Sequence, residues 1–141
     1  MKAVLIVCFM FICVNGFSQT KGNLKVDATV RKTDGTVIHK AKVSLVDSDE
    51  NIIAETLTNH KGRFEVSMPF DKDMRMVVEA KDCHSKVILF DTRNVPCNHQ
   101  QWGYEYGGFT IKLEPAGIGD PDTVARVAFR MEIENFDYEK R

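Results

Sequence analysis

Apolar and polar residues alternate one by one through much of this chain, and this alternation restricts its fold more than any other feature. Successive side chains of a β-strand point to opposite faces, so a period of two residues is typical of a strand with one buried face. No long window keeps the period of a helix, and we expect no helix. The pattern predicts eight strands, at residues 24–31, 41–45, 52–58, 63–68, 74–80, 86–90, 109–113 and 127–133.

Short strands separated by turn residues are typical of an all-β domain. We therefore expect an antiparallel sandwich with Greek-key connections over residues 22–114. The nearly continuous apolar run at residues 86–90 indicates a strand in the middle of a sheet. Residues 91–108 are irregular, and residues 115–141 are interpreted as a connector, a final strand and a loose charged tail.

The stretch from residue 56 to residue 68 supports the most detailed local prediction. Asn59 and Gly62 are residue types that tolerate a positive φ, so they let the chain reverse between two strands. From Phe64 to Met68 the even-numbered residues are apolar and the odd-numbered ones polar, which assigns one face to the core. This stretch predicts a β-hairpin.

The first 18 residues have the composition of a signal peptide. Lys2 precedes an uncharged apolar run at residues 3–14, which is too short for a transmembrane helix, and small residues follow it. We expect cleavage after Ser18, with Gly16 as the alternative site, and no transmembrane segment after cleavage. A periplasmic or secreted protein is therefore predicted, and the rival interpretation is an uncleaved membrane anchor.

The charges of the chain nearly balance, with 19 Lys and Arg against 20 Asp and Glu and a net charge of −1 at pH 7. A protein that binds nucleic acid through its phosphates needs a basic surface. We therefore expect no nucleic acid partner, and no motif in the chain calls for a cofactor.

Motifs with the spacing of a known family lie between residues 24 and 90. They are the turn Asp34-Gly35, the run Ala41-Lys42-Val43-Ser44-Leu45, the pair Thr58-Asn59 followed by Gly62 and Phe64, and Met76-Val77-Val78-Glu79-Ala80. This arrangement resembles the carboxypeptidase regulatory-like family, with Asn59 where the family usually has Asp. The resemblance implies a transthyretin-like (prealbumin-like) β-sandwich that binds or assists and has no catalysis of its own. The related hydrolase branch ends in Tyr-Arg-Gly-Ser, whereas this chain ends in Tyr138-Glu139-Lys140-Arg141.

Cys83 and Cys97 are the cysteines that remain after removal of the signal peptide, and in an exported protein they predict a disulfide. A zinc site is the alternative, because His84 adjoins Cys83 and His99 lies two residues after Cys97. The spacing of Cys83 and His84 does not suit a shared metal ion, since adjacent residues of a strand point to opposite faces. We keep His84 and His99 only as weak metal candidates and expect no metal.

Two further groups of residues have the types expected of a ligand site. Asp47, Asp49 and Asn51 imitate the first positions of a calcium loop, but Ile52 stands where glycine is needed, so a solvated turn is the preferred interpretation. Trp102, Tyr104 and Tyr106 alternate on a Gly-rich segment and could present a stacking surface for a sugar or a peptide. The alternative is that these aromatics cover the core.

The serines show no nucleophile elbow and the histidines show no zinc-protease motif, so we predict no catalytic residue. The predicted function is a non-catalytic exported binding or assembly module of the cell envelope, with an unknown envelope protein or extracellular ligand as its partner. One alternative is a structural or adhesive subunit of an outer-membrane complex, in which an exposed edge strand pairs with another chain. The others are a small carbohydrate- or metal-binding protein and a hydrolase.

Overall fold

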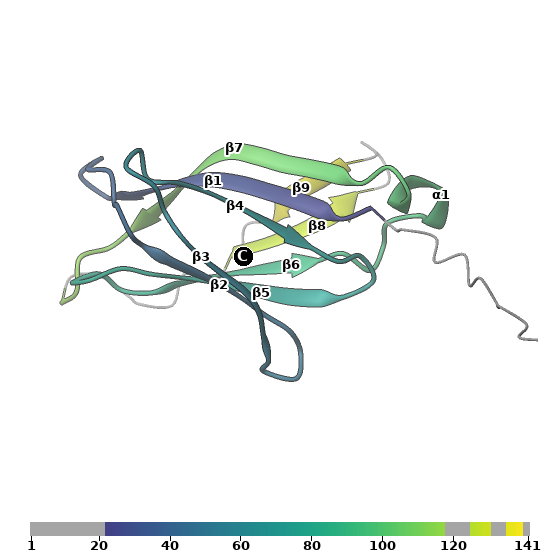
Figure 1. Ribbon diagram of the computed structural model, residues 1–141, viewed down its shortest axis with the longest axis horizontal. Helices are drawn as coiled ribbons and strands as arrows, with labels where there is room; N and C mark the ends of the chain where they lie inside the picture. Colours follow the sequence, from purple (N-terminus) through teal and green to yellow (C-terminus); the bar gives the residue numbers. More distant parts are fainter. Residues whose placement is uncertain (1–21, 118–124, 131–134, 140–141) are drawn as a thin grey trace, which may run out of the picture.

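The computed structural model describes residues 22–117, 125–130 and 135–139, so the predicted signal peptide lies outside the described residues. Two sheets pack face to face (Figure 1). The smaller sheet has the order β4 (Arg63–Met68), β1 (Leu24–Lys32) and β7 (Tyr104–Leu113). The larger has the order β3 (Ile52–Leu57), β2 (Lys42–Val46), β5 (Asp73–Glu79), β6 (Lys86–Asp91), β8 (Ala125–Arg130) and β9 (Asn135–Glu139). The prediction of an all-β sandwich is confirmed.

Most neighbouring strands run antiparallel, as expected. Two pairs run parallel instead: β1 with β7, and β6 with β8. The strand β6 lies between β5 and β8, so its predicted place inside a sheet is confirmed. Two parallel neighbours must be joined by a long crossover connection, and period-two alternation does not show which strands are joined in this way.

The core forms where the alternating apolar residues of the two sheets meet. Along β1 and β4 every second side chain is buried, and these two strands pair in register from Leu24 opposite Met68 to Ala28 opposite Phe64. Val78 and Ile111, on opposite sheets, are likewise buried. Burial of such side chains contributes about 1.5–3 kcal/mol each, which is what holds the two layers together.

The predicted hairpin at residues 56–68 is wrong in one respect. The chain does reverse after β3, but β3 pairs with β2 in the larger sheet and β4 pairs with β1 in the smaller sheet. The turn at residues 58–62 is therefore an arch that joins the two layers, and we refer to it below as the arch. Local turn residues predict a reversal, whereas the pairing partner of each strand depends on distant parts of the chain.

Three other expectations are also corrected. No helix is expected from the sequence, but a short one, α1 (Cys97–Gln100), lies in the region interpreted as irregular. The strand β7 begins at Tyr104 rather than at residue 109. The tail expected to be loose contains β9, which pairs antiparallel with β8. Of the predicted final strand at residues 127–133, residues 127–130 belong to β8 and residues 131–133 lie outside the described residues.

Candidate functional site

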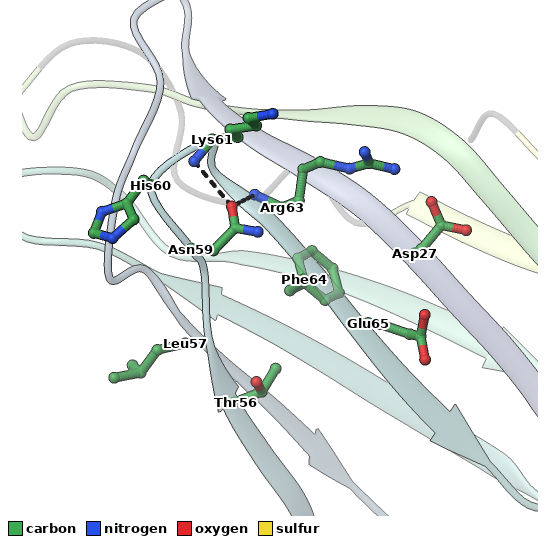
Figure 2. A pocket seen from close by; sticks show the side chains of 9 residues that line it. All are labelled: Asp27, Thr56, Leu57, Asn59, His60, Lys61, Arg63, Phe64 and Glu65. Carbon is green, nitrogen blue, oxygen red and sulfur yellow. Dashed lines mark hydrogen bonds between the residues drawn. The ribbon is translucent and has the colours of Figure 1, made fainter.

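An open groove lies at the arch, on the side of the sandwich where both β3 and β4 are edge strands (Figure 2). Its volume is about 750 Å³. The groove is lined by the end of β3, the arch, the start of β4 and one residue of β1, namely Thr56, Leu57, Asn59, His60, Lys61, Arg63, Phe64, Glu65 and Asp27. We refer to it as the arch groove.

Asn59 shapes the arch through its side chain. Its Oδ1 accepts the backbone N–H groups of Lys61 at 2.9 Å and Arg63 at 3.0 Å, both drawn as dashed lines in Figure 2. The backbone N–H of Asn59 in turn donates to the carbonyl of Arg63 at 3.0 Å. The sequence prediction gave Asn59 a role as a residue that tolerates positive φ, but it acts as a side-chain acceptor that mimics a backbone turn.

Gly62 supplies the positive φ of the arch, at +71°. It is buried, and its N–H donates to the carbonyl of Asn59 at 2.9 Å. A Cβ at this position would lie 2.8 Å from the carbonyl oxygen of Val30 and 2.8 Å from a side-chain carbon of Val37. The arch therefore requires glycine here for both its conformation and its space.

Thr58 is a structural residue that the sequence predicts only as part of a family motif, with no role of its own. It is 2% exposed. Its Oγ1 donates to the carbonyl of Ile38 at 2.7 Å and accepts the backbone N–H of Ala41 at 2.9 Å. Two backbone bonds add to this link, from Lys40 N–H to the Thr58 carbonyl and from Thr58 N–H to the Ala41 carbonyl. Thr58 thus ties the arch to the segment that precedes β2.

The acidic side chains around the arch groove have hydrogen-bond or ion-pair partners, whereas the basic ones have no acidic partner among the described residues. Glu65 binds the Lys25 ammonium at 3.3 Å, and this hydrogen bond raises the pKa of Lys25. Asp27 accepts the backbone N–H of Gly108 at 3.3 Å. Among the described residues the side chains of Lys61 and Arg63 have no acidic partner, so the groove offers two free cations.

Beside the groove, the edge strand β3 exposes aliphatic side chains. Ile53 is 49% exposed and Leu57 is 57% exposed, and both lie on the face of β3 opposite to Ala54, which packs against the core. Between them Glu55 binds Lys42 at 3.1 Å, and this contact lowers the pKa of Glu55. The outward residues of β4 are Arg63, Glu65 and Ser67, so of these two edges only β3 exposes large apolar side chains.

A second groove, of about 410 Å³, lies along parts of β5 and β6, and its charges are largely paired. The Arg93 guanidinium binds Asp91 at 2.9 Å and Asp73 at 3.3 Å, which raises the pKa of Arg93. Arg75 binds Glu50. Because these acids and arginines neutralise one another, this groove is less suited to a charged ligand than the arch groove.

The structure does not form the predicted disulfide, and both thiols are free. Cys83 lies in the connection between β5 and β6, where its backbone forms an isolated antiparallel β-bridge with Pro115. Cys97 is the first residue of α1, which follows the other end of β6. A six-residue strand spans about 20 Å, whereas bridged cysteines have Cα atoms within about 7 Å of each other. The fold itself separates the two cysteines.

The weak metal candidates are separated for the same reason. His84 Nε2 accepts the backbone N–H of Gly117 at 3.3 Å, whereas His99 Nδ1 lies 2.7 Å from the Tyr104 hydroxyl near the opposite end of β6. No group of three or more His, Cys, Asp or Glu residues in the described part of the chain is placed to hold a metal ion.

The segment that resembles a calcium loop in its residue types, Asp47 to Asn51, forms a turn. Asp47 Oδ1 accepts the backbone N–H groups of Asp49 and Asn51, both at 2.9 Å.

The three aromatics differ in how far they are exposed. Tyr104 and Tyr106 are half-buried in β7 and pack edge-on against Phe70 and Phe90, at centroid distances of 6.2 and 6.3 Å. Trp102, in contrast, is 84% exposed beside a shallow hollow. The core-covering alternative therefore describes the tyrosines, which pack against the core. Trp102 is open to a ligand, in a hollow that Tyr104 also lines.

Comparison with protein-family models finds no match, and comparison with curated proteins finds none either. Among solved structures, the chain resembles the pilus 2b backbone protein of group B streptococcus with a TM-score of 0.42 and 10% identity, over 66% of this chain and 41% of that one. It resembles catechol 1,2-dioxygenase from Pseudomonas arvilla C-1 with a TM-score of 0.49 and 11% identity, over 77% and 57%. The chain thus spans about half the length of these proteins, and likenesses this distant carry no argument about function. The resemblance to carboxypeptidase regulatory-like domains stays a prediction.

No helix in the described residues is long and apolar enough to cross a membrane.

Proposed function

We propose that this chain is an exported, non-catalytic module of the cell envelope that binds an extended segment of a partner protein along β3. The observation that carries the proposal is the exposure of Ile53 and Leu57 on an edge strand of the larger sheet. The signal-like residues 1–18 support export.

An edge strand offers unpaired backbone N–H and carbonyl groups, and an added strand satisfies them. Proteins commonly protect such edges with charged side chains, and β4 follows this pattern with Arg63 and Glu65. On β3 the only charged residue is Glu55, which is engaged by Lys42, while the flanking aliphatics remain open. This edge is therefore the better template for a partner strand.

The charges at the end of β3 indicate the chemistry of the partner. Leu57 lines the arch groove together with Lys61 and Arg63, and these two cations lack acidic partners among the described residues. A segment that fits both features has apolar residues at alternate positions and acidic residues at the end that reaches the arch. Contacts between free cations and carboxylates would set the direction in which this segment binds.

The test uses labelled peptides of about eight residues with alternating apolar residues and two terminal acidic residues. Binding is measured by fluorescence anisotropy against the wild-type protein and the variants Ile53→Lys and Leu57→Lys. We expect each variant to weaken binding by about tenfold or more, which corresponds to about 1.4 kcal/mol. Replacing the acidic residues of the peptide by lysine is expected to weaken binding in the same way.

The matched control is Thr110→Lys, which places the same charge on an exposed position of the edge strand β7. It should leave peptide binding unchanged. Analytical ultracentrifugation of the protein alone shows whether a second copy occupies β3 instead. The proposal would be overturned by a peptide panel that shows no binding, by equal losses in all three variants, or by a dimer that only the β3 variants dissociate.

The exposure of Trp102 supports a second candidate function, the binding of a carbohydrate. An indole that is 84% exposed adjoins a hollow lined by polar residues, among them Asn23, Lys25 and Glu105. Aromatic side chains with polar neighbours suit half-wet binding surfaces. Titration of Trp102 fluorescence with a panel of oligosaccharides tests this function, and an unchanged spectrum across the panel counts against it.

A further inference from the structure

Two histidines that are distant in the sequence lie side by side at one end of the sandwich. His39 belongs to the segment before β2 and His60 belongs to the arch, and the centroids of their rings are 4.7 Å apart with an angle of 36° between the planes. Both side chains are exposed. Neither ring makes a hydrogen bond within the described residues, whereas His84 and His99 each use a ring nitrogen in such a contact.

The backbone on both sides of each histidine is held in place. Next to His39, the carbonyl of Ile38 accepts Thr58 Oγ1 at 2.7 Å and the N–H of Lys40 donates to the Thr58 carbonyl at 3.1 Å. Next to His60, the Asn59 side chain accepts the N–H of Lys61 at 2.9 Å. The pair is therefore presented by two turns that are joined to each other, and little backbone order would have to be gained for both rings to bind one ligand.

The spacing of the rings suits a shared metal ion. A nitrogen–metal bond to imidazole is about 2.0–2.1 Å, and the ring centre lies about 1.1 Å behind the nitrogen. Two imidazoles on one ion at angles of about 90–110° then have centroids about 4.5–5.1 Å apart. The observed 4.7 Å falls inside this range.

We propose that His39 and His60 together bind a divalent transition-metal ion, with Cu²⁺ preferred over Ni²⁺ and Zn²⁺. Neutral imidazole is a ligand that suits these ions, and affinity at a given nitrogen site rises toward Cu²⁺. No third His, Cys, Asp or Glu completes the site within the described residues, so water or a donor from another molecule occupies the remaining positions. The exposed ammonium-bearing residues Lys40 and Lys61 adjoin the pair in the chain and oppose added positive charge, which limits the affinity.

The test uses untagged protein in which the cysteines are replaced by serine, because free thiols bind and reduce Cu²⁺. Calorimetric titration with Ni²⁺ measures affinity and stoichiometry, and electron paramagnetic resonance of the Cu²⁺ form counts the coordinated nitrogens. We expect one ion per chain and two imidazole nitrogens. His39→Gln and His60→Gln should each lower the affinity at least tenfold and leave one imidazole nitrogen.

The matched control is His84→Gln, which removes a histidine that lies outside the pair and leaves metal binding unchanged. Circular dichroism confirms that each variant keeps the sheet structure. The proposal is overturned if the wild-type protein binds no ion, if single variants of the pair bind as tightly as the wild type, or if His84→Gln removes binding. If the two rings only stack on each other, the wild-type protein binds no ion.

Discussion

The side chain of Thr58 donates a hydrogen bond to the backbone carbonyl of Ile38, 20 positions earlier in the chain, at a distance of 2.7 Å. The same hydroxyl accepts the backbone N–H of Ala41. One buried oxygen thus satisfies two backbone groups that belong to another segment. This contact brings together the arch groove and the His39–His60 pair.

Replacing Thr58 by valine keeps the shape of the side chain but removes its hydroxyl. The carbonyl of Ile38 and the N–H of Ala41 then lose their buried partner, and we expect the free energy of unfolding to fall by about 2–3 kcal/mol. Urea unfolding measures the change. Thr58→Ser, which keeps the hydroxyl and loses one methyl group, should cost about 1 kcal/mol. Equal losses in the two variants would assign the role of Thr58 to packing.

Gly62→Ala is expected to destabilise the protein more than Gly35→Ala. Both glycines have a positive φ, at +71° and +90°, so both variants carry the cost of about 1 kcal/mol or more that an L-residue incurs there. At Gly62 the new Cβ also meets Val30 and Val37, whereas the space around Gly35 is open. We expect a further loss of about 1–3 kcal/mol for Gly62→Ala, measured by urea unfolding. A smaller loss than for Gly35→Ala would show that the arch can relax.

Asp47 is expected to make stability depend on acid pH. The backbone N–H of Asn51, which donates to Oδ1, is the main cause that lowers the pKa of Asp47 below its ordinary value. A carboxylate whose pKa is lower in the folded state stabilises the fold fully above its unfolded pKa, about 3.9, and loses this contribution as the pH falls through the folded pKa.

The comparison variant is Asp47→Asn, whose side-chain oxygen can accept the same backbone bonds without titrating. We expect the wild type to be the more stable protein near pH 7 and the difference to shrink below about pH 4. Urea unfolding over this pH range measures it. A constant difference would exclude the linkage to Asp47.

The thiols of Cys83 and Cys97 are expected to react with iodoacetamide without prior reduction. Because Cys97 is exposed and Cys83 is half-buried, Cys97 should be labelled faster. Peptide mapping by mass spectrometry measures the labelling of Cys83 and of Cys97 individually and distinguishes both from Cys8 and Cys13. A peptide pair that becomes free only after reduction would restore the disulfide predicted from the sequence.

Several features of the candidate site could be anticipated from residue types alone. Gly62 predicts a reversal because few residues accept its positive φ, and Asn59 because its short side chain can accept nearby backbone N–H groups. The alternation after the reversal places Phe64 in the core. The exposed Leu57 and the histidine pair could not be anticipated in this way. Their positions depend on which strand is an edge and on which turn lies beside the arch.

By itself, the sequence determined that the chain forms strands, where many of them begin and end, and which face of each is buried. These properties follow from the local period of two and from the conformational limits of turn residues. Tertiary structure alone decided that β3 and β4 belong to different sheets, that β6 separates Cys83 from Cys97, and that His39 meets His60. The reason is that strand pairing is selected by contacts between distant segments, and the alternation is the same whichever neighbour a strand takes.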